Sequence, residues 1–72
     1  MIVKLSNGGQ TRSIEVAPGT EVGHVRSFEE ELEDIGAPGT YTLAIDGQGV
    51  DDNVALQSGC TVTFRPVQGN KG

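Results

Sequence analysis

The C-terminal end of the chain carries the residues best suited to covalent chemistry. It reads as a β-strand that continues into a polar tail ending on glycine, Thr61-Val-Thr-Phe-Arg-Pro-Val-Gln-Gly-Asn-Lys-Gly72. A glycine carboxylate has no Cβ to crowd an incoming adenylate or nucleophile, and glycine's backbone freedom lets a tail enter a narrow channel. The residues after Phe64, the last one expected to face the core, span roughly 26 to 29 Å when extended. Gly72 is therefore a candidate chemical handle, and a frayed chain end is the alternative.

The other reactive side chains lack the partners that chemistry requires. His24 falls on the polar side of a predicted helix with nothing to position it as a general base. Cys60 has no cationic neighbour or helix N-terminus to activate its thiol. The carboxylates between Glu29 and Asp34 splay around a helix, which favours a solvated face or a dock for a basic partner over a metal site. We expect no catalytic residue, metal or cofactor, and therefore no enzyme.

Length and composition restrict the class of protein. A chain of 72 residues forms one domain, and its formal net charge of −5 with only five Lys and Arg disfavours binding to nucleic acid. The single cysteine excludes an internal disulfide and favours the cytoplasm. No apolar run approaches the roughly 18 residues of a membrane span. We expect a small acidic protein, monomeric, that acts through protein–protein interaction.

Alternating apolar residues predict a β-hairpin at the start of the chain. Residues 1 to 5 and 11 to 16 form its two strands, and Ile14 and Val16 face the core. Asn7-Gly8 between them favours a tight type I′ turn.

A helix is predicted next, over about residues 21 to 35. Thr20 is its candidate N-cap, Gly36 suits the left-handed position after its last turn, and Pro38 prevents its continuation. Gly23 weakens the first turn by up to about 1 kcal/mol relative to alanine. One apolar stripe at helical spacing contains Val22, Val25, Phe28, Leu32 and Ile35.

The second half of the chain predicts shorter elements. Residues 40 to 45 form a third strand, Asp46-Gly47 a second tight turn, and residues 49 to 53 a short strand or loop. Residues 54 to 56 are expected to form one helical turn with Leu56 in the core.

The order of these elements predicts the fold. Residues 61 to 64 form the last strand, which we expect beside the first, and the helix must bury its apolar stripe against the sheet. This is an α+β fold of the β-grasp type, with a mixed sheet of four to five strands and one helix packed across it. The domain covers residues 1–66, and residues 67–72 form a flexible C-terminal tail.

The chain resembles ubiquitin and the small sulfur carriers of thiamine and molybdopterin biosynthesis along nearly its whole length. Besides the N-terminal hairpin, the resemblance rests on three segments: Ala17-Pro18-Gly19-Thr20-Glu21-Val22, Leu43-Ala44-Ile45-Asp46-Gly47 and Leu56-Gln57-Ser58-Gly59-Cys60-Thr61-Val62-Thr63-Phe64. The ending is also similar to the glycine-lysine-glycine ending of bacterial ubiquitin-like proteins encoded with PRTRC systems.

The resemblance implies that an adenylating enzyme of the ubiquitin-activating type activates the carboxylate of Gly72. The activated carboxylate then becomes a thiocarboxylate, as in a sulfur carrier, or passes to a thiol and on to a lysine, as in a protein modifier. The tail residues Gly69, Asn70 and Lys71 would lead into the enzyme. Lys71 departs from the double glycine with which the relatives usually end.

The partner surface also differs from that of the relatives. The positions that correspond to ubiquitin's apolar patch are Ala44 and Arg65, so we expect a reduced patch and a polar contact through Arg65. Two other functions remain open from the sequence. The chain could be a non-covalent interaction module with the same fold, or a small structural component of a phage or mobile-element assembly.

Overall fold

The computed structural model describes residues 1–67, and residues 68–72 are not described further. The elements are, in order, β1 (Ile2–Asn7), β2 (Gln10–Glu15), the 3₁₀ helix η1 (Val22–Ser27), α1 (Glu29–Asp34), β3 (Tyr41–Ile45), β4 (Gln48–Val50) and β5 (Thr61–Pro66).

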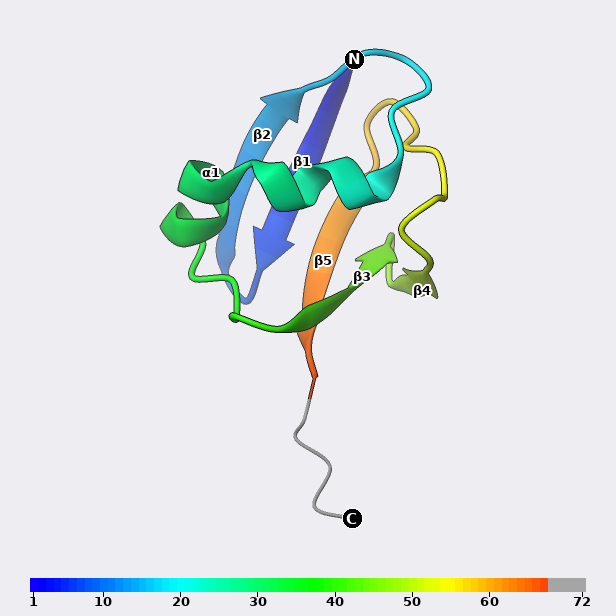
Figure 1. Ribbon diagram of the computed structural model, residues 1–72. Helices are drawn as coiled ribbons and strands as arrows, with labels where there is room; N and C mark the ends of the chain where they lie inside the picture. Colours follow the sequence, from blue (N-terminus) through cyan, green and yellow to red (C-terminus); the bar gives the residue numbers. More distant parts are fainter. Residues whose placement is uncertain (68–72) are drawn as a thin grey trace.

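One mixed sheet organises the molecule. Its strand order is β2-β1-β5-β3-β4, with β5 parallel to β1 and antiparallel to β3. The last strand therefore lies beside the first, as predicted, and occupies the centre of the sheet. The helical segment crosses one face of the sheet (Figure 1). The predicted α+β β-grasp fold is confirmed, with five strands. The face opposite the helices, which we call the open face, bears no further layer within residues 1–67.

The core lies between the sheet and the helical segment. Its fully buried members come from all parts of the chain: Val3, Leu5, Val22, Val25, Leu43 and Val62. Ile14, Val16 and Leu56 are also buried, as the alternation and spacing predict. Each fully buried valine or leucine side chain stabilises the fold by about 1.5 to 3 kcal/mol relative to exposure.

The two hairpins differ in the turn that closes them. The first turn is shifted by one residue from the prediction, because Asn7 pairs with Gln10 and the central residues are Gly8 and Gly9. Only Gly8 has a positive φ, 63°, which is the type II′ pattern rather than type I′. The second hairpin turns at Asp46 and Gly47, whose φ values of 50° and 87° match type I′.

The single helix predicted over residues 21 to 35 is wrong in detail, since the segment divides at Phe28 into η1 and α1. The backbone of Phe28 leaves helical geometry, with φ −86° and ψ 64°. Thr20 is not the cap, because its hydroxyl donates to the carbonyl of Ala17 at 2.6 Å. The predicted apolar stripe is confirmed, because four of its five residues are buried and Phe28 is partly buried.

The loop after β4 caps the start of the helical segment. The N–H of Val22 donates to the carbonyl of Val54 at 2.8 Å, and the N–H of Gly23 donates to the carbonyl of Asp52 at 2.9 Å. These loop carbonyls satisfy N–H groups that a helix start leaves unpaired. Ala55 bridges to Glu21, so residues 54 to 56 run extended and the predicted helical turn is wrong.

Asn7 closes the other end of the helical segment. Its side-chain amide donates to the carbonyls of Ile35 and Gly36, at 3.0 and 2.9 Å. Gly36 has a φ of 71°, which confirms the left-handed residue expected after the helix. The first hairpin is thereby tied to the C-terminal end of α1.

Candidate functional site

The C-terminal end of β5 is the part of the structure nearest to the candidate chemical handle. β5 leaves the sheet beyond the first residue of β3, with Pro66 opposite Tyr41 (Figure 1). The N–H of Val67 still donates to the carbonyl of Thr40 at 3.2 Å. The main chain is therefore held by its neighbour up to the last described residue. Gly69, Asn70, Lys71 and Gly72 lie outside the described residues, so their predicted role and the boundary at residue 66 stay predictions.

The open face of the sheet is polar along β5, from the start of the strand, where Lys4 pairs with Thr61, to its exit, near which Arg65 lies. Strand alternation turns the side chains of Lys4, Thr42, Thr61, Thr63 and Arg65 to this face, since their neighbours along the strands are the buried ones. The side chains that these strands turn to the open face therefore carry hydroxyl groups and two positive charges.

Ala44 does not present a partner surface, which corrects the prediction made from the sequence. It is fully buried, although it points to the open face. The Arg65 side chain starts opposite Thr42 and donates from Nη2 to the carbonyl of Gly47 at 2.7 Å. Its Nη1 also lies 3.9 Å from where a Cβ on Gly49 would be. Because Gly49 is paired with Ala44, this path takes the guanidinium across Ala44 and covers it.

Arg65 is exposed and remains the candidate partner contact at this surface. It lies two residues before the last described residue, on the face that adjoins the exit of β5. From there its guanidinium extends toward the turn between β3 and β4, where it donates to the carbonyl of Gly47.

The other side chains weighed from the sequence occupy ordinary structural positions. Cys60 is 5% exposed and packs in the core. The His24 ring meets Phe28 edge to face, with ring centroids 5.5 Å apart. Within residues 1–67 there is no group of three or more His, Cys, Asp or Glu side chains that could hold a metal ion. No helix in the same residues is long and apolar enough to cross a membrane.

The charge of the molecule is unevenly distributed. Carboxylates crowd the helical segment and the loop after β4, where Arg12 pairs with Asp34 and Arg26 with Asp52. Lys4 and Arg65 of the open face take part in no salt bridge within residues 1–67. The negative net charge therefore belongs to the helical side, and the open face is the more positive of the two. Charge of this kind orients approaching partners.

Arg26 joins the loop after β4 to the helical segment and the sheet. Its guanidinium donates two hydrogen bonds to Asp52, from Nε at 2.8 Å and Nη2 at 3.0 Å, and lies 4.8 Å from the centroid of the Tyr41 ring. Hydrogen bonds from Arg26 lower the pKa of the Asp52 carboxyl below its usual range. Sequence reasoning missed this contact because the two residues are far apart in the chain.

The Arg26→Gln variant tests this contact through its pH dependence. Because folding lowers the pKa of Asp52, the contact stabilises the fold above the unfolded pKa, near pH 4, and the stabilisation is lost as pH falls through the folded pKa. We expect the pKa of Asp52 to rise toward its ordinary value in Arg26→Gln, measured by NMR titration of the carboxyl carbons. Arg12→Gln is the matched control and leaves it unchanged. An Asp52 pKa that is the same in Arg26→Gln and wild type would contradict the assignment.

Comparison with known proteins places this geometry in a superfamily. A scan of protein-family models and a search of curated proteins found no match. Solved structures do match: SAMP1 from Haloferax volcanii has a TM-score of 0.69 and 15% identity, covering 97% of this chain and 100% of that one. Ubiquitin of Caldiarchaeum subterraneum has a TM-score of 0.62 and 28% identity, covering 96% and 98%.

A third match comes from a complex of two proteins. In the complex of subunits 1 and 2 of the molybdopterin-converting factor from Helicobacter pylori, the matched chain has a TM-score of 0.64 and 21% identity, covering 97% of this chain and 100% of that one. The chain thus has the β-grasp fold of the superfamily of ubiquitin-like and sulfur-carrier proteins, and each of these matches covers 96 or 97% of it. The resemblance found in the sequence is confirmed at that level, and the similarity to PRTRC-encoded proteins stays a prediction.

Proposed function

We propose that this protein is a ubiquitin-like or sulfur-carrier-like protein whose Gly72 carboxylate is activated by an adenylating enzyme. The observation that supports this most is the position of β5. The strand lies between β1 and β3 at the centre of the sheet and leads the chain out past the start of β3. In this arrangement a rigid domain presents a chain end, and the domain itself is a substrate and carrier rather than an enzyme.

The proposed reaction takes place at the glycine carboxylate. A carboxylate oxygen of Gly72 attacks the α-phosphorus of ATP, and pyrophosphate leaves. Hydrosulfide then attacks the acyl carbon and AMP leaves, which gives a thiocarboxylate, or a cysteine thiolate of the enzyme attacks it and AMP leaves, which gives a thioester. In the second case an amine displaces the thiol and an amide forms. Glycine fits both steps, because its carbonyl carbon has no adjacent Cβ to block the nucleophile.

The tail provides the reach that the reaction requires. Residues 68 to 72 follow the last described residue, and five extended residues span up to about 17 Å. That length carries a carboxylate well inside another protein while Val67 remains at the surface of the domain. The molybdopterin-converting factor structure, in which a chain of this fold is in complex with another subunit, is consistent with such a partner.

Lys71 sets a condition on the partner. A lysine side chain is long and charged, whereas the relatives usually have glycine at this position. The channel that receives this tail therefore needs room and a carboxylate or open solvent next to Lys71, because burying an unpaired ammonium is strongly unfavourable. We infer a partner adapted to this chain rather than one shared with double-glycine carriers.

We propose that the partner docks on the open face through Arg65. The Arg65→Gln variant removes the charge while leaving an amide of similar shape, so we expect kcat/KM for adenylation to fall about tenfold with kcat little changed. Arg12→Gln, on the helical side of the sheet, is the matched control and should lose less than twofold. Equal losses in the two variants would argue against docking through the open face.

Intact-mass spectrometry of the protein isolated from its own host tests the proposal. With an affinity tag placed at the N-terminus, which leaves Gly72 unaltered, we expect a fraction of molecules to carry a thiocarboxylate or to be joined through an amide to another protein. Free carboxylate alone, under all growth conditions sampled, would contradict the proposal and favour a non-covalent interaction module. The chemistry takes place in the cytoplasm under this proposal, which agrees with the single cysteine in the core.

A further inference from the structure

Asn7 and Gly8 form a dipeptide whose chemistry the proposed function does not use. In an asparagine–glycine pair, the main-chain nitrogen of the glycine can attack the side-chain amide carbon of the asparagine and expel ammonia. Glycine favours this attack because it has no Cβ to crowd the ring that forms. The chain has two further asparagines, which are followed by a valine and a lysine. By its sequence, Asn7 is therefore the asparagine most susceptible to deamidation.

The nucleophile and the leaving group of this reaction have different surroundings in the structure. Gly8 is exposed in the turn after β1, and its N–H donates no main-chain hydrogen bond within residues 1–67. The amide nitrogen of Asn7 is held instead, since it donates to the carbonyls of Ile35 at 3.0 Å and Gly36 at 2.9 Å. An amide nitrogen has two hydrogens, and both are used. Because this nitrogen leaves as ammonia, the reaction has to break both hydrogen bonds.

The same amide caps the C-terminal end of α1. The N–H groups of Gly36 and Ala37 donate back to the carbonyls of Glu33 and Leu32. The carbonyls of Ile35 and Gly36 lie beyond the last turn, where a helix leaves its carbonyls unpaired. Within residues 1–67 the only hydrogen bonds they accept come from Asn7. The link between the first hairpin and the helical segment thus depends on a donor that deamidation removes.

Deamidation replaces this donor with a charged acceptor. The nitrogen of Gly8 bonds to Cγ of Asn7, and the proton of its N–H leaves with the amide nitrogen as ammonia, which gives a cyclic succinimide. Water then opens one of the two carbonyls of the ring, which gives aspartate or isoaspartate. Either carboxylate would face the oxygens of two carbonyls and has no hydrogen to donate to them. Isoaspartate also adds one carbon to the main chain at the residue that pairs with Gln10.

We propose that Asn7 is a site of spontaneous deamidation, which the folded protein slows through these two hydrogen bonds, and that the modification detaches the first hairpin from the end of α1. Opening of the contact permits the reaction, and the product cannot close the contact again. A carboxylate at the carbonyl end of a helix is also unfavourable. Arg12, on the same side of the sheet, is already paired with Asp34. The modification requires only water and does not depend on the chemistry proposed for Gly72.

The rate of deamidation in the full-length protein tests this site. Protein at neutral pH is followed by mass spectrometry of its peptides, in buffer and in urea, beside the acetylated, amidated peptide Leu-Ser-Asn-Gly-Gly-Gln. We expect Asn7 to convert about thirtyfold more slowly in the folded protein than in urea, since two hydrogen bonds have to open. Equal rates would show that the amide is not held. No conversion in the folded protein after many half-lives of the peptide would show that the site is not used, and either result overturns the proposal.

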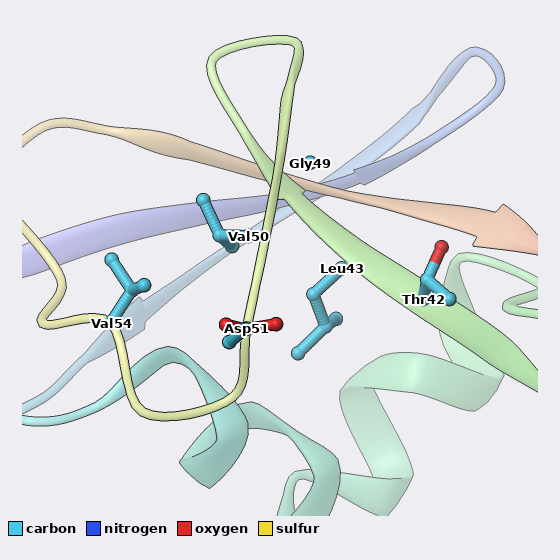
Figure 2. A pocket seen from close by; sticks show the side chains of 6 residues that line it. All are labelled: Thr42, Leu43, Gly49, Val50, Asp51 and Val54. Carbon is cyan, nitrogen blue, oxygen red and sulfur yellow. The ribbon is translucent and has the colours of Figure 1, made fainter.

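Asn53 is the internal control for this experiment. It is exposed and lies between Asp51 and Val54, in the loop after β4 that lines an open pocket beside β3 (Figure 2). No hydrogen bond within residues 1–67 involves its side chain, but the valine that follows is branched at Cβ and crowds the ring. We expect Asn53 to convert more slowly than Asn7 in urea. Conversion of Asn53 as fast as that of Asn7 overturns the assignment of the site to Asn7.

The Asn7→Asp variant tests the consequence of the modification, because it reproduces one of the two products. We expect hydrogen exchange of the Gly36 and Ala37 amides to become about tenfold faster than in wild type. Asn53→Asp makes the same chemical change in the loop after β4 and should alter these rates less than twofold. Unchanged exchange in Asn7→Asp, or equal changes in the two variants, overturns the proposal. If Asn7→Asp does not fold, the rate experiment still decides, since it uses the wild-type chain.

Discussion

Replacing Gly23 with alanine is expected to lower the free energy of unfolding by about 2 kcal/mol, which for a domain of this size lowers Tm by roughly 8 to 16 °C. A Cβ at this position would lie 2.8 Å from the Cβ of Asp52 and 3.0 Å from its carbonyl oxygen. The carbonyl cannot move aside freely, because it accepts the N–H of Gly23 itself. Thermal or urea denaturation followed by circular dichroism measures the change.

The sign of this effect decides between two roles for Gly23. If it were only a weak helix former, alanine would raise stability by up to about 1 kcal/mol. If it permits the close approach of the loop, alanine lowers stability. Gly39→Ala is the matched control, since Gly39 has no positive φ and nothing within 4 Å of its would-be Cβ. A Gly23→Ala protein as stable as wild type would mean that the loop does not pack on η1 as described.

Deletion of Gly72 is expected to abolish every activated or conjugated form of the protein while leaving the fold unchanged. The deletion moves the terminal carboxylate to Lys71, whose Cβ and charged side chain then adjoin the reacting carbon. It lies outside the described domain, so amide spectra of residues 1–67 should overlay those of wild type. Mass spectrometry and gel-shift analysis of tagged protein in the host provide the measurement.

Lys71→Gly is the companion variant for this deletion. It creates the double glycine of the relatives, so a partner that only tolerates Lys71 should activate the variant at least as well as wild type. A partner that requires Lys71 through a carboxylate of its own should lose affinity, with a higher KM and an unchanged kcat. Modified protein that persists after deletion of Gly72 would show that the chemistry takes place elsewhere on the chain.

The strands and the core could be predicted from the sequence because their signals are local. Alternation placed Ile14 and Val16 in the core, and the glycines of the two hairpin turns marked their ends. The sequence Asn7-Gly8-Gly9 is compatible with more than one turn. The register with which β1 and β2 bury their apolar faces decides between these turns, and that register depends on residues outside the turn.

The contacts of the loop after β4 could not be predicted, because they join segments distant in sequence. From the sequence alone, Gly23 is only a residue that weakens a helix. In the structure, Asp52 packs against it and leaves no room for a Cβ. The same contacts hold the loop against the start of η1, beside the pocket lined by Thr42, Leu43, Gly49, Val50, Asp51 and Val54. Ala44 was misplaced for a related reason: alternation correctly gave its direction, but only the structure shows that Arg65 covers it.

Some features of the candidate site are seen in the structure, and its reaction is inferred from chemistry. β5 at the centre of the sheet and the polar open face are structural features of residues 1–67. The activation of Gly72 is inferred from the glycine residue type, the length of the tail and the structural similarity to ubiquitin-like and sulfur-carrier proteins. An experiment on the carboxylate itself therefore carries the most weight.

ATP–pyrophosphate exchange tests that carboxylate most directly. The purified protein is mixed with each adenylating enzyme of the ubiquitin-activating type from its host, ATP and radiolabelled pyrophosphate, and label entering ATP is counted. Reversible formation of the Gly72 acyl adenylate predicts exchange that requires the protein, saturates with its concentration and disappears when Gly72 is deleted. No exchange with any of these enzymes, each shown to be active on another carrier, would contradict the account.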